Sequence, residues 1–196
     1  MKTKTLKSIK KGLIIVISAP SGAGKTTLCK EALKKLKNTI VSVSVTTRKP
    51  RPLEKNGKDY FFVSEQKFKS MISKKEFAEW ALVHGHYYGT PKKRLIDTIN
   101  KGKNIMLIID VQGGEKIRRI FKDGLFIFVA PPSKKALEQR LVNRAQDNEE
   151  TIKLRLKNAQ KEMAYAKNYN HVVVNDKLNN AVAQIIAIIK SRKSKN

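Results

Sequence analysis

The sequence predicts an α/β fold, in which a parallel sheet carries helices on both faces. Short apolar runs rich in β-branched residues alternate with stretches of helical pattern, as expected for strands that are buried on both faces. A glycine-containing turn separates the first apolar run from the first helical pattern. A chain of 196 residues suits one domain with a substantial core.

The core elements follow from this alternation. Strands are predicted at 13–18, 105–109, 125–130 and 171–174. Helices are predicted at 25–37, 112–121, 134–143, 149–167 and 178–192. Ser133 follows two prolines and suits the N-cap of its helix, while Asn175 or Asp176 ends the last strand.

Between the first helix and the strand at 105–109, the pattern changes to short segments separated by proline and glycine. Strand-like segments occur at 41–45, 60–63 and 77–88, and a short helix is predicted at 65–74. Asn56-Gly57 is a turn signal between two of them. This region therefore predicts an inserted lobe of mixed α/β structure that is mostly β.

The turn after the first strand has the composition of a phosphate-binding loop. It reads Ala19, Pro20, Ser21, Gly22, Ala23, Gly24, Lys25 and Thr26. Gly22 and Gly24 allow positive φ, so that successive N–H groups converge on an anion at the helix N-terminus. Lys25 suits the terminal phosphates of a nucleotide, and the Thr26 hydroxyl suits Mg²⁺. Ala19 replaces the usual first glycine and must keep a negative φ, and the alternative is an ordinary glycine-containing turn.

The charge balance is strongly basic, with 42 Lys plus Arg against 16 Asp plus Glu and a formal charge of +26. Such a charge is typical of nucleic-acid binders. Here, however, the lysines are spread over nearly every segment, which favours a solvated surface over a dedicated groove. We expect attraction of anionic nucleotides and salt-sensitive, nonspecific RNA binding, without a specific nucleic-acid partner.

One cysteine, Cys29, excludes an intramolecular disulfide and favours a reducing compartment. Lysines before the first apolar run resemble the start of a signal peptide, but cleavage near Ala19 would destroy the phosphate-binding loop. No run approaches the roughly 20 apolar residues of a membrane span. These features predict a cytoplasmic protein without membrane association, and none of them specifies an oligomeric state.

A second basic group follows at Arg48 and Arg51, in a loop stiffened by Pro50 and Pro52 and close in sequence to Tyr60. Two fork-shaped guanidinium groups near a tyrosine hydroxyl suit a phosphate monoester. Taken alone, a basic proline-rich loop is more often an exposed connection.

Ordered motifs now identify a resemblance. They are S-V-S-x-T-T-R-x-P-R-x-x-E-x-x-G-x-x-Y-x-F-V at 42–63, F-x-E-W at 77–80, G-x-Y-Y-G-[ST] at 85–90, Asp110-Val111-Gln112-Gly113, Ala130-Pro131-Pro132-Ser133, the 140–155 segment and Val174-Asn175-Asp176. Over about 12–190 the chain resembles the guanylate kinases, a P-loop nucleoside-monophosphate kinase family. The resemblance implies a P-loop NTPase-type core at about 12–40, 104–138 and 156–192, a GMP-binding lobe at 41–92 and a helical lid at 139–155.

The resemblance also implies roles for individual residues. GMP would be bound by Ser44, Arg48, Arg51, Glu54, Tyr60, Glu79, Tyr88, Thr90 and Asp110. Glu79 would accept hydrogen bonds from the guanine N1–H and exocyclic amine, an edge that adenine lacks. ATP would be bound by residues 19–26 and Asn175, with Mg²⁺ at Thr26. Lys25, Arg48, Arg140, Arg144 and Arg155 would act in phosphoryl transfer.

The implied activity is transfer of the γ-phosphoryl group of ATP to GMP, and to dGMP, giving ADP and GDP for nucleotide supply and recycling. Two departures stand out: Ile108 replaces an acid that the family often has, and Ala145 replaces a lid glycine. The alternatives are a kinase for another monophosphate, an RNA-binding protein, and a catalytically inactive guanylate-kinase-like binding module. The binding module predicts a decayed P-loop, whereas Lys25 and Thr26 are retained.

Overall fold

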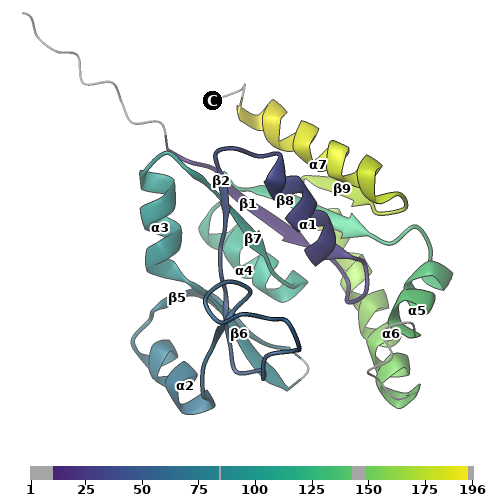
Figure 1. Cartoon of the computed structure of the whole chain (residues 1–196), viewed down its shortest axis with the longest axis horizontal. Helices are drawn as coiled ribbons and strands as arrows, with labels where there is room; N and C mark the ends of the chain where they lie inside the picture. The colour runs from purple at the N-terminus through teal and green to yellow at the C-terminus, as the bar shows by residue number, and fades with distance from the viewer. Residues whose placement is uncertain (1–10, 84, 143–148, 194–196) are drawn as a thin grey trace, which may run out of the picture.

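The protein is described by a computed structural model that covers residues 11–83, 85–142 and 149–193. Its centre is a parallel sheet of five strands in the order β2-β7-β1-β8-β9 (Figure 1). The strands are β1 (Ile14–Ser18), β2 (Thr39–Val41), β7 (Asn104–Ile108), β8 (Leu125–Ala130) and β9 (His171–Val174). All residues of β1 and β8 are buried, which explains why both strands are continuous apolar runs.

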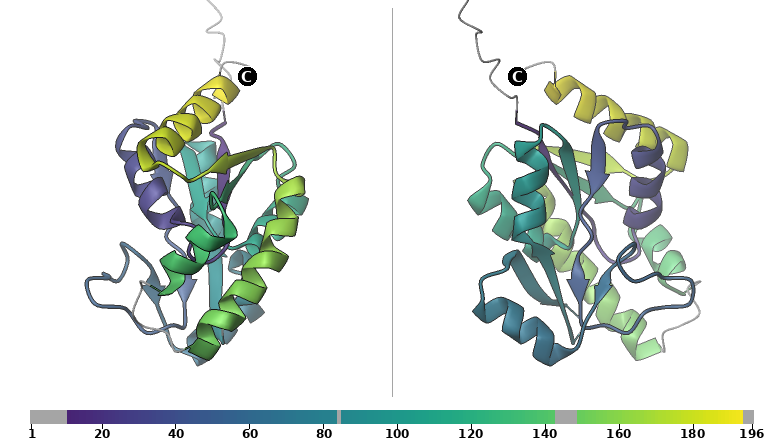
Figure 2. Two further views of the ribbon diagram at one scale, coloured as in Figure 1. Left: turned by 90° about the vertical axis from the view of Figure 1, so that its right-hand side faces the viewer. Right: turned by 60° about the vertical axis from the view of Figure 1, so that its left-hand side comes forward.

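Helices cover both faces of this sheet, as the sequence predicts. Ile15 and Ile17 of β1 pack with α1 (Lys25–Lys34) and α7 (Leu178–Lys193), whereas Ile14 and Val16 pack with α3 (Lys92–Asn100) and α4 (Val111–Ile120). The left view of Figure 2 shows α1 and α7 on one side of the sheet and α6 (Glu149–Met163) on the other. Alternate residues of one strand therefore belong to two separate cores.

A second, smaller sheet lies beyond one end of the main sheet (Figure 1). Its order is β4-β3-β6-β5, formed by β3 (Val45–Thr46), β4 (Phe61–Phe62), β5 (Phe77–Val83) and β6 (His86–Pro91). The helix α2 (Glu65–Ser73) packs against it, and the Phe68 ring stacks on Phe77 and Tyr87 with centroids 4.5 and 5.3 Å apart. Aromatic stacking thus fastens α2 to the sheet.

Two helices, α5 (Lys134–Val142) and α6, lie at the opposite side of the molecule from α2 (Figure 1). The 3₁₀ segment η1 (Ala164–Asn168) follows α6. The predicted N-cap is confirmed, because the backbone N–H of Ala136 donates to Ser133 Oγ at 3.1 Å. Leu137 and Leu141 of α5 form a small apolar cluster with Ala159 of α6. This cluster joins α5 to α6.

Several boundaries differ from the sequence predictions. The segment 41–45 is not one strand, because β2 ends at Val41 in the main sheet and β3 begins at Val45 in the second. The segment 77–88 is a hairpin whose turn contains Gly85 at φ 78°. The first helix ends at Lys34 rather than residue 37. The helix α3 was not predicted, because it lies in the region whose sequence pattern indicates an inserted lobe. Its buried residues nevertheless pack against β7 of the main sheet.

Within the described ranges, no helix is both long and apolar enough to cross a membrane.

Candidate nucleotide-binding site

A cavity of about 220 Å³ opens where the carboxyl ends of β1 and β7 face the second sheet and α6. It is lined by residues 19–26, Ser44, Arg51, Tyr60, Glu79, Val83, Tyr88, Gly89, Ile108, Ile109, Asp110, Arg155 and Glu162. In open parallel α/β sheets, ligands bind beyond the carboxyl ends of the strands. The cavity therefore brings Lys25 of the phosphate-binding loop and Arg51 of the second basic group to one place.

The loop between β1 and α1 has the predicted conformation of a phosphate cradle. Gly22 and Gly24 adopt φ of 89° and 82°, and α1 begins directly after them at Lys25. Ala19 is not among the residues with positive φ, as expected for a residue with a Cβ. Behind the loop, Asn175 Nδ2 donates to the Ala23 carbonyl at 2.8 Å. Asn175 thus fixes the backbone of the loop from the end of β9 without lining the cavity.

Lys25 points along the floor of the cavity toward the end of β7. Its Nζ donates to the Ile109 carbonyl at 2.6 Å. Burial lowers the pKa of the Lys25 ammonium, and the nearby Asp110 charge opposes that shift. Thr26 is exposed at the first turn of α1. An ammonium and a hydroxyl are thus available beside the loop N–H groups.

Asp110 caps the helix that follows β7. Its Oδ1 accepts hydrogen bonds from the backbone N–H groups of Gln112 and Gly113 at 2.7 and 3.1 Å. The carboxylate therefore stabilises the start of α4 while Asp110 lines the cavity. Two residues earlier, Ile108 also lines the cavity, so the position where the family often has an acid contributes an apolar side chain.

The arginine-containing loop is organised around Glu54. Arg48 Nη2 lies 2.9 Å from both carboxylate oxygens of Glu54, and the backbone N–H of Arg51 donates to Glu54 Oε2 at 2.8 Å. The Arg48 guanidinium also lies 5.5 Å from the centroid of the Tyr60 ring. Arg48 and Glu54 do not line the cavity, whereas Arg51, Tyr60 and Tyr88 do. Glu54 therefore holds the loop that presents Arg51.

Glu79 is a buried carboxylate with only 6% of its surface exposed. Thr90 is fully buried, and its hydroxyl donates to Glu79 Oε1 at 2.6 Å across the β5–β6 pair. Burial raises the pKa of the Glu79 carboxyl to about 7, although the Thr90 hydrogen bond opposes the shift. Ser44 is also buried and lines the same wall. A protonatable carboxyl in a cavity is a typical recognition group.

Glu162 was not singled out in the sequence. It lies near the end of α6, and its Oε2 accepts a hydrogen bond from the backbone N–H of Ser21 at 3.3 Å. Burial raises the pKa of the Glu162 carboxyl, and Lys25 opposes that shift. The available signal was spacing, because Arg155 and Glu162 are seven residues apart and so lie on one face of a helix.

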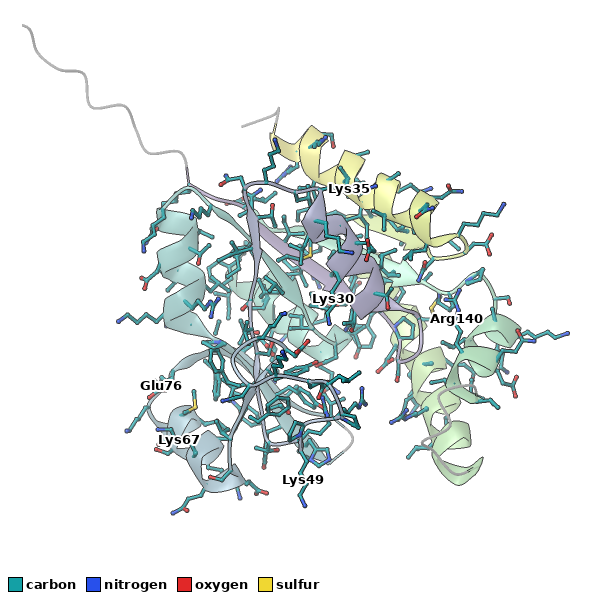
Figure 3. All side chains as sticks on the ribbon, viewed as in Figure 1. Lys30, Lys35, Lys49, Lys67, Glu76 and Arg140 are labelled. Carbon is teal, nitrogen blue, oxygen red and sulfur yellow. The ribbon has the colours of Figure 1, made fainter. Side chains whose placement is uncertain are left out.

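Of the remaining predicted residues, Arg140 does not line the cavity. Arg140 Nη2 donates to the Asn175 carbonyl at 2.9 Å, while Arg140 Nη1 is buried and has no hydrogen-bond partner among the described residues. Figure 3 shows Arg140 on the α5 side of the molecule and Lys49, next to Arg48, at the outer edge of its loop. Arg144 and Ala145 lie outside the described residues.

Comparisons with known proteins agree with this arrangement. The family model described as guanylate kinase matches residues 11–192. A guanylate kinase of Caldanaerobacter subterraneus is 49% identical over 187 residues, which are 95% of this chain and 91% of that protein. A guanylate kinase of Thermotoga maritima is 44% identical over 185 residues, which are 94% of this chain and 89% of that protein.

A solved structure is also similar. The crystal structure of guanylate kinase from Anaplasma phagocytophilum superposes with a TM-score of 0.77 at 35% sequence identity. The superposition covers 93% of this chain and 86% of that chain. The similarity therefore extends over both sheets and the helices that pack on them.

Proposed function

The chain belongs to the guanylate kinase family, which transfers the γ-phosphoryl group of ATP to GMP, and from this premise we propose how its own residues perform the reaction. The observation that carries the proposal is that the phosphate cradle and the buried Glu79 carboxylate line one cavity. An ATP bound at the P-loop and a GMP whose guanine is bound at Glu79 would then be held together in one active site.

At the acceptor end, Glu79 reads the guanine by accepting from its N1–H and exocyclic amine, with Ser44, Thr90 and Asp110 near the remaining polar edge. The proposal is supported by the burial of Glu79, since adenine would leave this carboxylate without donors. The Thr90 hydroxyl keeps Oε1 in place. None of these contacts requires a 2′-hydroxyl, so dGMP is expected to be a substrate as well.

The GMP phosphate is bound by Arg51, Tyr60 and Tyr88 from the cavity wall and by Arg48 after a small movement of its loop. The proposal is supported by the Glu54 contacts, which join Arg48 to the backbone of Arg51. Glu54 acts by orienting this loop. Guanidinium groups held in advance bind a phosphate at a lower entropic cost.

ATP is bound with its phosphates on the loop formed by residues 19–26, and Asn175 acts by supporting that loop. Mg²⁺ suits this end, because the exposed Thr26 hydroxyl is an oxygen donor beside the cradle and the phosphates supply further oxygens. When bound, the ion would neutralise charge on the phosphates of ATP.

Transfer itself needs no general base, since the acceptor phosphate is ionised near neutral pH. Catalysis is then positioning and charge neutralisation by Lys25 and the arginines Arg48, Arg140, Arg144 and Arg155. Support comes from Arg155, which lines the cavity, and from the buried Nη1 of Arg140, from which no described residue accepts a hydrogen bond. We propose that 41–92 is the GMP-binding lobe and 139–155 the lid, which close over the substrates and exclude water.

We further propose a cytoplasmic location, where ATP and GMP are found.

The test is ADP formation from ATP and Mg²⁺ with GMP, dGMP, AMP, CMP and UMP in turn. We expect turnover with GMP and dGMP alone. Turnover with AMP at a comparable kcat/KM would contradict guanine reading by Glu79. The binding-module alternative predicts GMP binding by calorimetry without ADP formation.

A further inference from the structure

One interaction in the cavity places a carboxylate of the protein in the loop that is built to bind phosphate. The P-loop binds anions through its backbone N–H groups, and Glu162 already supplies an anionic oxygen to one of them. Glu162 Oε2 accepts from Ser21 N at 3.3 Å, although 141 residues separate the two in sequence. The carboxylate also lies within the electrostatic reach of Lys25.

This interaction conflicts with the binding of a nucleotide. An N–H group makes one strong hydrogen bond, so the Ser21 N–H cannot serve both the carboxylate and a phosphate oxygen. The cavity is small, and like charges brought together in it repel each other strongly. Asp110 already adds a second carboxylate to the same wall. Phosphates in the cradle therefore require Glu162 to leave it.

Arg155 belongs to the same helix as Glu162 and lies two helical turns from it. Both residues line the cavity. A phosphate that displaces the Glu162 carboxylate therefore enters beside the Arg155 guanidinium.

We propose that Glu162 occupies the phosphate cradle in the nucleotide-free enzyme and that the phosphates of ATP displace it from the Ser21 N–H. The proposal deepens the proposed function and rests on it. Glu162 is thus a positioning residue that makes ATP compete with a carboxylate of the protein itself.

The decisive variant is Glu162→Gln, which keeps an acceptor for the Ser21 N–H but removes the charge. We expect its affinity for ATP and ADP to rise roughly threefold to tenfold, because the competing anion is weaker. Adenosine carries no phosphate, and its affinity should not change. The matched control is Glu138→Gln, which makes the same change at an exposed position on the neighbouring helix α5 and should leave all three affinities unchanged.

Affinities are measured by isothermal titration calorimetry at one alkaline pH, with thermal unfolding to check that each variant folds. Glu162→Ala serves as a second variant and should also bind ATP more tightly than the unsubstituted chain. Equal or weaker ATP binding by both folded variants would overturn the inference. So would a parallel change for adenosine, which would indicate a purely structural role. Failure of the proposed function has a different signature, since the unsubstituted chain would then form no ADP with GMP.

Discussion

The two ends of the cavity are built in different ways. The donor end is backbone at the carboxyl ends of the parallel strands, held by contacts such as Lys25 Nζ to the Ile109 carbonyl and Asn175 Nδ2 to the Ala23 carbonyl. The acceptor end is a set of side-chain pairs, Arg48 with Glu54 and Glu79 with Thr90, on a small sheet whose strands are only partly buried. Disturbing the donor backbone should therefore cost stability and catalysis together, whereas acceptor-end changes should alter nucleotide choice with little or opposite effect on stability.

The largest effect on catalysis is expected where the charge of Lys25 is removed from the donor end. Lys25→Ala should lower kcat for GMP phosphorylation by about 10³- to 10⁴-fold, because no other ammonium of the described residues lines the cavity to neutralise the transferring group. Initial-rate kinetics with saturating ATP and GMP measure this change. Lys34→Ala, which removes an exposed ammonium from the same helix, should leave kcat unchanged. A kcat for Lys25→Ala within tenfold of the original would contradict the assigned role.

At the acceptor end, Glu79→Gln should lower kcat/KM for GMP by about 10²- to 10³-fold, because an amide offers one acceptor where guanine presents two donors. The same change should stabilise the unliganded protein at about pH 8 by about 2 to 3 kcal/mol, since it removes a charge that burial disfavours. Kinetics and chemical denaturation measure the two effects. Glu76→Gln is the control, because Glu76 is exposed at the outer edge of the same sheet (Figure 3). Loss of both activity and stability in Glu79→Gln would contradict the expected difference between the acceptor and donor ends.

Arg48→Lys should raise KM for GMP about tenfold to thirtyfold, since lysine cannot reproduce the paired contact with both Glu54 oxygens. The free energy of unfolding should fall by less than about 1 kcal/mol, because the ion pair is partly exposed. Arg119→Lys, at an exposed position of α4, should change neither quantity. An equal rise in KM for ATP would show that the two ends are not separable.

The pH dependence of GMP binding should follow the Glu79 carboxyl, whose pKa burial raises to about 7. Guanine needs the ionised form, so KM for GMP should rise about tenfold from about pH 8 to pH 6. Stability runs the other way, because the folded state holds this proton more tightly than the unfolded chain does. The stabilisation is complete below the ordinary glutamate pKa of 4.5 and is lost as pH rises through about 7. In Glu79→Gln both trends should flatten, and a persisting trend would assign them to another group.

The smallest effect on kinetics is expected at Asn175, whose side chain supports the backbone of the phosphate-binding loop. Asn175→Ala leaves the buried Ala23 carbonyl without its partner, so we expect a loss of about 1 to 2 kcal/mol in unfolding free energy. KM for ATP should rise about threefold while KM for GMP stays constant. Asn180→Ala, at an exposed position of α7, is the control. A change confined to KM, with full stability, would indicate direct contact with the nucleotide.

Particular elements show how far the sequence could predict the fold. The strands β1 and β8 were predicted because strands buried on both faces are apolar at every position. β2 was not predicted, because the strand segment predicted at 41–45 shares only Val41 with it, and its three residues are defined as a strand only by pairing with β7. In the site, motifs identified the residues of the P-loop, the arginine-containing loop and the strands β5 and β6. Glu162 was missed because it belongs to no motif, and its contact with Ser21 joins residues that are far apart in sequence.

By itself the sequence determined the α/β class, the phosphate-binding loop with its two positive-φ glycines, and the family, because glycine placement, strand hydrophobicity and ordered motifs are local properties of the chain. The tertiary structure alone decided how deeply Glu79 is buried, that Lys25 reaches the Ile109 carbonyl and that Glu162 reaches the P-loop. Burial and charge depend on which distant segments pack together. They therefore arise only when the chain folds.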